Sequence, residues 1–194
     1  QVLIPVKNDE RFVGKAIESV LGQTYGNLSV IVSDNCSTDS TRAVVEGFMA
    51  DRRVSLIRRE RDIGSLENFN ACLDLVTAPY HMLLCSDDML VGPDALAMAR
   101  EALARHPQAS AVYSDMAFLD DSGKRVAVRR FGRSGLVDAW SVAMKCFRTS
   151  RNWFGIPLLV RSSCVGSIRY SPDLGYATDV DFSITVSKGA SIYH

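Results

Sequence analysis

Two adjacent carboxylates, Asp87 and Asp88, close an apolar run at 80–84 that has the composition of a buried strand. Like charges side by side are costly unless water, a cation or a ligand compensates them. Mg²⁺ and Mn²⁺ are commonly held by one or two carboxylates, with water and a diphosphate completing the coordination. We therefore interpret Asp88 as a metal ligand, and Asp87 as either an assisting ligand or the partner of a sugar hydroxyl.

Polar residues also follow two other predicted strands, at 7–9 and at Asp34-Asn35. Ligands of open parallel sheets bind beyond the carboxyl ends of the strands. Asp and Asn are common turn residues, so each pair alone has an ordinary structural explanation. Three such ends at one edge favour a binding site.

The segment 33–41 adds a predicted helix start to this edge, with Ser37 or Thr38 as its cap. The free amides and the dipole of a helix start favour an anion or the accepting edge of a base. The sequence contains neither GxxxxGK[ST] nor GxGxxG, so both glycine-rich phosphate cradles are excluded.

Short β-rich runs alternate with helical patterns along the first two-thirds of the chain. Nearly continuous apolar strands between helices predict an α/β fold with a parallel sheet covered on both faces. The predicted strands are 2–6, 28–33, 54–57, 80–85 and 110–115, and the predicted helices are 12–21, 37–48, 65–76 and 93–106.

After Asp115 this rhythm changes. The segment 120–124 predicts a turn between two antiparallel strands, and 131–155 is irregular, aromatic and basic. A short apolar run at 156–160 and a helix beginning near Asp179 close the chain. We infer one domain over 1–194, in which 1–115 and 116–194 form two unlike halves, and expect it to be truncated at the C-terminus.

The composition is that of an ordinary globular protein. The chain has 194 residues, and its 22 basic and 22 acidic residues give a formal net charge of zero. This balance removes any bulk electrostatic argument for nucleic acid. No uninterrupted apolar span approaches the ~18 residues of a transmembrane helix. Five cysteines without a CxxC pair favour a reducing compartment, so we expect a cytoplasmic protein.

Three motifs, VLIPVKND, SVIVSDNCSTDST and LLCSDDML, resemble in order and spacing the nucleotide-sugar domain of family 2 glycosyltransferases. The QTY at 23–25 also fits. The resemblance covers 2–115 closely and the remainder weakly. It implies a GT-A fold, with a Rossmann-like, mostly parallel sheet flanked by helices. It also implies an inverting transfer from a nucleoside-diphosphate sugar, with a UDP-sugar as first choice, to an acceptor hydroxyl.

The resemblance assigns Pro5, Val6 and Lys7 to the nucleoside pocket. Asp34 and Asn35 stand where family members usually have two acids, one of which typically contacts the nucleobase. An asparagine can both donate and accept hydrogen bonds there. Cys36 follows in the place of the family's glycine.

The segment 86–88 falls on the family's DxD-like motif. Asp87 is then expected to face the ribose or the sugar, and Asp88 to bind Mg²⁺ or Mn²⁺ on the diphosphate. The family's general base lies at a helix start further along the chain. YATDVDF at 176–182 matches it and places the base at Asp179, with Asp181 as second choice. Asp179 as a simple helix cap is the ordinary alternative.

Arginines interleave with Phe and Trp between 129 and 155. Packing with solvated arginines is the ordinary interpretation, and an acceptor-side role would have Trp153 stacking on a sugar ring. The expected acceptor is a saccharide or a lipid-linked molecule, and no nucleic acid partner is expected. A homodimer and a peripheral position at the inner face of the membrane stay open.

A non-catalytic nucleotide-sugar-binding or interaction domain of the same fold is the alternative function. The presence of Asp87, Asp88 and Asp179 together favours the enzyme. A response-regulator receiver would need an aspartate after the third strand, where the sequence has Arg58 and Arg59. A sugar nucleotidyltransferase would need a glycine-rich loop after the first strand, which is absent.

Overall fold

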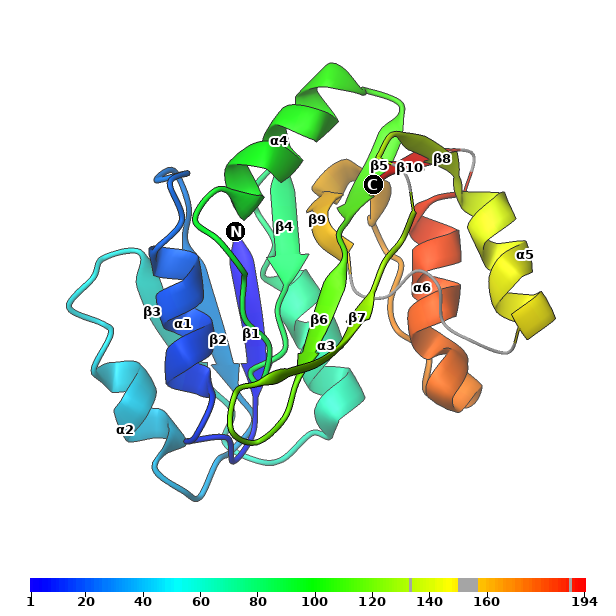
Figure 1. Cartoon of the computed structure of the whole chain (residues 1–194). Coiled ribbons are helices and arrows are strands. Elements are labelled where there is room, and N and C mark those ends of the chain that lie inside the picture. The colour runs from blue at the N-terminus through cyan, green and yellow to red at the C-terminus, as the bar shows by residue number, and fades with distance from the viewer. Residues whose placement is uncertain (133, 150–156, 189) are drawn as a thin grey trace.

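Figure 1 shows the computed structural model of the chain, which describes residues 1–132, 134–149, 157–188 and 190–194. The first half alternates strands and helices as predicted: β1 (Val2–Val6), α1 (Val13–Leu21), β2 (Val30–Asp34), α2 (Thr41–Glu46), β3 (Val54–Arg58), α3 (Ser65–Asp74), β4 (Tyr80–Leu83), α4 (Ala95–Arg105) and β5 (Ala109–Tyr113). The second half contains β6 (Met116–Leu119), β7 (Arg125–Arg129), β8 (Leu136–Asp138), α5 (Ala139–Thr149), β9 (Pro157–Arg161), α6 (Thr178–Val186) and β10 (Ser191–Tyr193).

Within the described residues, eight strands form one mixed sheet in the order β3-β2-β1-β4-β9-β5-β10-β8. Parallel pairs join β1 to β2 and β4, β2 to β3, and β5 to β10. Strand β9 is antiparallel to both β4 and β5 and separates them. The predicted α/β class with a mainly parallel sheet is confirmed, while the antiparallel β9 within it was not foreseen.

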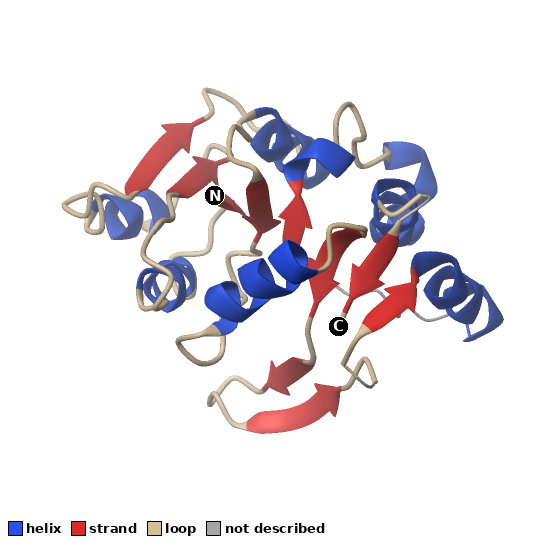
Figure 2. Ribbon diagram, turned by 90° about the horizontal axis from the view of Figure 1, so that it is seen from above, coloured by secondary structure: helices blue, strands red, loops and turns tan. Residues whose placement is uncertain are grey.

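Both faces of the sheet are buried because its strands carry apolar side chains on both sides. In β1, Ile4 packs on one face together with Ile17 of α1 and Val45 of α2. Leu3, one residue earlier, packs on the opposite face in the cluster that contains Phe182 of α6. Successive side chains of a strand point to opposite faces, so continuous apolar runs require helices on both sides, as Figure 2 shows.

The prediction of an irregular segment over 131–155 is wrong for part of its length, because β8 and α5 occupy 136–149. The buried side chains of α5 recur at helical spacing: Ala139, Val142, Ala143 and Cys146. Exposed aromatic residues hide this pattern, since Trp140 is 63% exposed and Phe147 is 67% exposed. The segment 150–156, which includes Trp153, lies outside the described residues.

The predicted hairpin around 120–124 is formed by β6 and β7, which pair in antiparallel fashion apart from the main sheet. Asp120 accepts hydrogen bonds from the amides of Ser122, at 2.9 Å, and Lys124, at 3.0 Å, and so shapes the turn. Among the helices that the structure describes, none combines the length and apolar character needed to span a membrane.

Candidate functional site

The carboxyl ends of β1, β2 and β4 lie at one edge of the sheet. Val6 is in register with Asp34, and Leu3 is in register with both Ile31 and Leu83. The hydrogen-bond ladder continues one step past β2, where the amide of Asn35 donates to the carbonyl of Val6 at 2.8 Å, and one step past β4, where the amide of Leu84 donates to the carbonyl of Leu3 at 2.9 Å. The three polar strand ends predicted to converge are thus neighbours.

Lys7 and Asn35 both bind an acid that the sequence interpretation missed, Asp62. Lys7 Nζ forms an ion pair with Asp62, and Asn35 Nδ2 donates to Asp62 Oδ1 at 2.7 Å. The ammonium of Lys7, followed by the amide of Gly64, lowers the pKa of Asp62. Asn35 is itself only 1% exposed, and its Oδ1 accepts from the amide of Ile63 at 2.9 Å. Because Asn35 is buried and holds Asp62 by a hydrogen bond, the polar group exposed at this sheet edge is the carboxylate of Asp62.

Asp34 is completely buried at the end of β2. Its Oδ1 accepts from the amide of Ser37 at 2.9 Å, and its Oδ2 lies 3.7 Å from Nε of Arg58. Within the described residues, that Oδ2 has no hydrogen-bond partner. Pro5 and Val6 are also buried, inside β1, so Lys7 is the exposed member of that predicted group.

The predicted capping of the second helix by Ser37 or Thr38 is wrong, because α2 begins only at Thr41. The backbone amides of the segment 33–41, which were expected to be free for a ligand, donate in part to side chains of the loop after β1. The amide of Thr38 donates to Asn8 Oδ1 at 2.8 Å, and that of Ser40 to Glu10 Oε2 at 2.7 Å. The segment 8–10 thus fills the place where an anion was expected.

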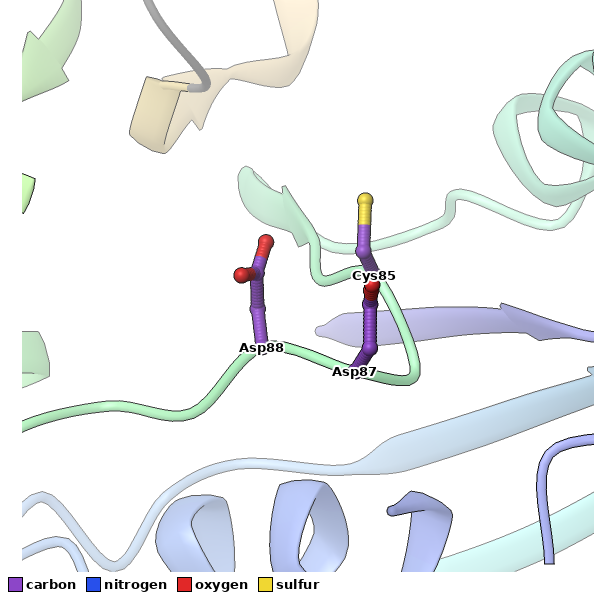
Figure 3. A group of neighbouring side chains, drawn as sticks. All are labelled: Cys85, Asp87 and Asp88. Carbon is purple, nitrogen blue, oxygen red and sulfur yellow. The ribbon is translucent and has the colours of Figure 1, made fainter. Parts of the chain in front are cut away.

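The loop after β4 carries the predicted metal ligands (Figure 3). Cys85 Sγ and one carboxylate oxygen each of Asp87 and Asp88 all lie within 4.8 Å of one another. Burial, and then the charge of Asp87, raises the pKa of Asp88. Burial is also the main cause that raises the pKa of the Cys85 thiol to about 12, with further contributions from Asp88, Asp87 and Asp179. The two neighbouring carboxylates are therefore mutually unfavourable without a cation, while a hydrogen bond from the Cys85 thiol favours the ionised form of Asp88.

Asp179, in the first turn of α6, contributes to the raised pKa of Cys85 in the loop after β4. Desolvation raises the pKa of the Asp179 carboxyl, although the residue as a whole is exposed. The N-cap of α6 is Ala177, and no side chain caps it. The alternative that Asp179 merely caps this helix is therefore not supported. Asp181 lies in the same turn and is half-buried.

Helix α3 fixes the segment that leads into α6. Asn70 accepts from the amide of Tyr170 at 2.8 Å and donates to its carbonyl at 3.0 Å. The ring of Tyr170 stacks on Phe182 of α6 with a centroid distance of 4.2 Å. A cavity of about 200 Å³ adjoins Asp88 and is lined partly by Asp115 and Met116. These contacts give α6, the helix that carries Asp179, a packed support.

Comparison with known proteins gives a consistent assignment. Residues 1–173 match the family described as Glycosyl transferase family 2. The glycosyltransferase GlyG of Streptococcus pneumoniae is 29% identical over 90 residues, which are 46% of this chain and 30% of GlyG. The chain spans less than half the length of the curated relatives it matches.

Two solved structures share the fold. S. aureus TarS 1–349 in complex with UDP-GlcNAc matches with a TM-score of 0.79 and 20% identity, over 98% of this chain and 54% of that one. The mannosyltransferase PcManGT from Pyrobaculum calidifontis, in complex with GDP-Man and Mn²⁺, matches with a TM-score of 0.70 and 17% identity, over 99% of this chain and 53% of that one. At these identities the likeness concerns the fold, which is of the GT-A type.

Proposed function

The chain belongs to glycosyltransferase family 2, and we propose that it transfers a sugar from a nucleoside-diphosphate sugar to an acceptor hydroxyl with inversion at the anomeric carbon. One observation carries the proposal: carboxylate oxygens of Asp87 and Asp88 lie within 4.8 Å of each other on the loop after β4, at the end of a strand paired with β1.

The nucleoside is proposed to bind at the ends of β1 and β2. Lys7 and Asp62 are the exposed polar groups at these strand ends, Asn35 donates a hydrogen bond to Asp62, and Asp34 lies buried at the end of β2. A carboxylate accepts hydrogen bonds and suits the N–H edge of a base such as uracil. The TarS complex with UDP-GlcNAc supports a UDP-sugar as the donor to test first.

Asp88 is proposed to bind Mg²⁺ or Mn²⁺, with Asp87 facing the ribose or sugar. The fit is supported by carboxylate oxygens within 4.8 Å of one another on one loop, whose mutual repulsion a cation would relieve. The Mn²⁺ in the PcManGT complex also favours a divalent cation. When bound, the cation supplies positive charge that stabilises the diphosphate leaving group.

Asp179 is proposed as the general base, with Asp181 as second choice. As the acceptor oxygen forms its bond to the anomeric carbon, the Asp179 carboxylate takes the hydroxyl proton while the bond to the diphosphate breaks. The raised pKa of Asp179 makes it a stronger base than an ordinary aspartate. Placed proton removal of this kind contributes roughly 10²–10⁴-fold to a rate.

The acceptor is proposed to be a saccharide or a lipid-linked molecule that meets the 116–194 half of one GT-A domain. The five cysteines, which form no CxxC pair, favour a cytoplasmic location. We also propose a homodimer and a peripheral position at the inner face of the membrane.

Calorimetry with UDP tests the donor site: binding with Mn²⁺ and a large loss of affinity with EDTA are expected, and equal affinity in both would contradict the metal role. Slow, Mn²⁺-dependent hydrolysis of nucleotide-sugars without acceptor separates the enzyme from the non-catalytic alternative. A domain that binds UDP yet never releases sugar from any donor, with or without acceptors, would favour the alternative.

A further inference from the structure

The charge of the chain is divided unevenly between its two halves. Residues 1–115 carry 11 basic and 16 acidic side chains, a net charge of −5, whereas residues 116–194 carry 11 basic and 6 acidic side chains, a net charge of +5. The formal balance of zero hides this division. Charge asymmetry between two halves favours a partner with a charged surface, such as a nucleic acid or a membrane.

The β6–β7 hairpin belongs to the basic half and stands apart from the main sheet (Figures 1 and 2). Among the described residues, its two strands pair only with each other. In β7 every residue from Arg125 to Val128 is exposed. A two-stranded hairpin is at best marginally stable in water unless a further strand or helix covers it. The hairpin therefore has the form of an element that docks on a partner.

The exposed side chains of this hairpin combine apolar and basic chemistry. Its large apolar residues are all exposed: Phe118, Leu119, Val126 and Val128. Basic residues stand among them: Lys124, Arg125, Arg129 and Arg130. The guanidinium of Arg129 lies over the ring of Phe118, 5.7 Å from its centre. Of the two acids in the turn, Asp120 is engaged by backbone amides.

We propose that the β6–β7 hairpin docks the chain on a bilayer surface that contains anionic phospholipids. The apolar side chains enter the boundary between headgroups and acyl chains, while the basic side chains stay at the level of the lipid phosphates. A nucleic acid would use the basic residues but not Val126 and Val128, which offer neither a charge nor a ring for a base. A symmetric contact with a second copy would bring like charges of two hairpins together.

This surface deepens the peripheral membrane position proposed above. It rests on the proposed function in one respect, since a hairpin of the acceptor-side half at a bilayer favours a lipid-linked acceptor over a free saccharide. Attachment to lipid itself needs no donor, metal or transfer step. It can therefore be tested without them.

Cosedimentation of the intact chain with vesicles provides the test. Vesicles of equimolar phosphatidylglycerol and phosphatidylcholine should bind the chain, vesicles of phosphatidylcholine alone should not, and salt should weaken binding by screening. Each basic residue near an anionic surface strengthens binding about fivefold, so Arg125→Gln with Arg130→Gln should weaken it more than about tenfold. Arg52→Gln with Arg100→Gln, which removes two exposed arginines of the acidic half, should bind as wild type.

A single apolar substitution tests the other part of the surface. Val126→Ser should weaken vesicle binding about tenfold, because less apolar surface enters the bilayer. Met98→Ser is the matched control, since Met98 of α4 is also an exposed apolar residue, and it should bind as wild type. Both positions are exposed, so both variants should keep the melting temperature of the wild type.

A wild-type chain that ignores the anionic vesicles, or that binds both kinds of vesicle equally, would overturn the proposal. Unchanged binding of Val126→Ser and of the Arg125 and Arg130 variant would overturn it as well. A dimer that Val126→Ser dissociates, in a chain that binds no vesicle, would assign the hairpin to a second copy instead. Calorimetry with UDP and Mn²⁺ keeps the two proposals apart: vesicle binding without UDP binding refutes the donor site alone, and UDP binding without vesicle binding refutes the hairpin proposal alone.

Discussion

Replacing Asp88 by asparagine should change the stability of the chain in opposite directions with and without a divalent cation. Without a cation, the ionised carboxylate is unfavourable in the folded state, because burial and the charge of Asp87 both raise its pKa. Asparagine has a similar size and no charge. Asp88→Asn should therefore increase the free energy of unfolding at neutral pH.

The size of this effect follows from the loop geometry. Carboxylate oxygens of Asp87 and Asp88 lie within 4.8 Å of each other, where two unit charges repel by about 0.9 kcal/mol at the dielectric constant of water. The water value is appropriate because Asp87 is exposed. Desolvation of Asp88 adds to this repulsion, so we expect a gain of about 1 kcal/mol.

The pH dependence has a definite sign. The pKa of Asp88 is raised in the folded state, so its ionisation penalty is complete above that folded pKa. The penalty fades as the pH falls toward 3.8, the ordinary value of an aspartate. The advantage of Asp88→Asn should therefore be present at pH 7 and lost in acid. Saturating Mn²⁺ should reverse the order, since a ligand at 100 times its Kd stabilises the wild type by about 2.7 kcal/mol.

Urea denaturation at pH 7 and at acid pH, with Mn²⁺ and with EDTA, measures these differences. Asp121→Asn is the matched control, because Asp121 is an exposed acid in the turn between β6 and β7; it should behave as wild type. If Asp88→Asn is the less stable protein in EDTA, Asp88 has a structural role. If Mn²⁺ stabilises both proteins equally, Asp88 does not bind the metal.

Three further predictions concern the base, a buried clamp and a strained residue. Asp179→Asn should lower the transfer rate about 10²–10⁴-fold with little effect on donor binding, whereas Asp181→Asn should be much milder; normal turnover of Asp179→Asn would contradict the assignment. Asn68→Ala should lower the free energy of unfolding by about 2–3 kcal/mol, because it removes two hydrogen bonds to Ser33 and leaves a buried hydroxyl unpaired. Ser33→Ala removes only one of the two bonds but leaves the buried Asn68 Oδ1 without its donor, so it should cost somewhat less, about 1–2 kcal/mol. Urea denaturation of both variants checks these values, and an Asn68→Ala protein as stable as wild type would refute them. Cys36 has a φ of 61°, so Cys36→Gly should raise the unfolding free energy by up to about 1 kcal/mol after the entropy cost of glycine; a lower Tm would count against strain there.

The alternation of elements was readable from the sequence because each strand is a continuous apolar run. The first strand, predicted at 2–6, is observed over Val2–Val6. Helix α5 was missed because Trp140 and Phe147 are exposed among its buried positions. The place of β9 could not be read from periodicity, since the choice of a strand's partners depends on the whole sheet.

The sequence predicted only part of the site, because some of its contacts join residues that are distant in the chain. Asp87, Asp88 and Asp179 were identified from motifs, and the structure brings the first two together on the loop after β4. Asp62 was missed because its role depends on Lys7 and Asn35, which are distant in sequence. An acid two residues before a glycine, in the loop after β3, was the available signal: Gly64 adopts a φ of 85°, which few other residues tolerate.

The position of β9 between β4 and β5 has a consequence for how the protein is made. During synthesis β4 and β5 emerge first, and both keep an unpaired edge until Pro157–Arg161 arrives to join them. Unpaired edges are templates for association with other chains, and long-range strand pairing is slow. A nascent chain halted after Thr149 should therefore aggregate more readily than the full chain, as light scattering of released fragments would reveal. A fragment that stays monomeric would show that other contacts protect these edges before β9 is inserted.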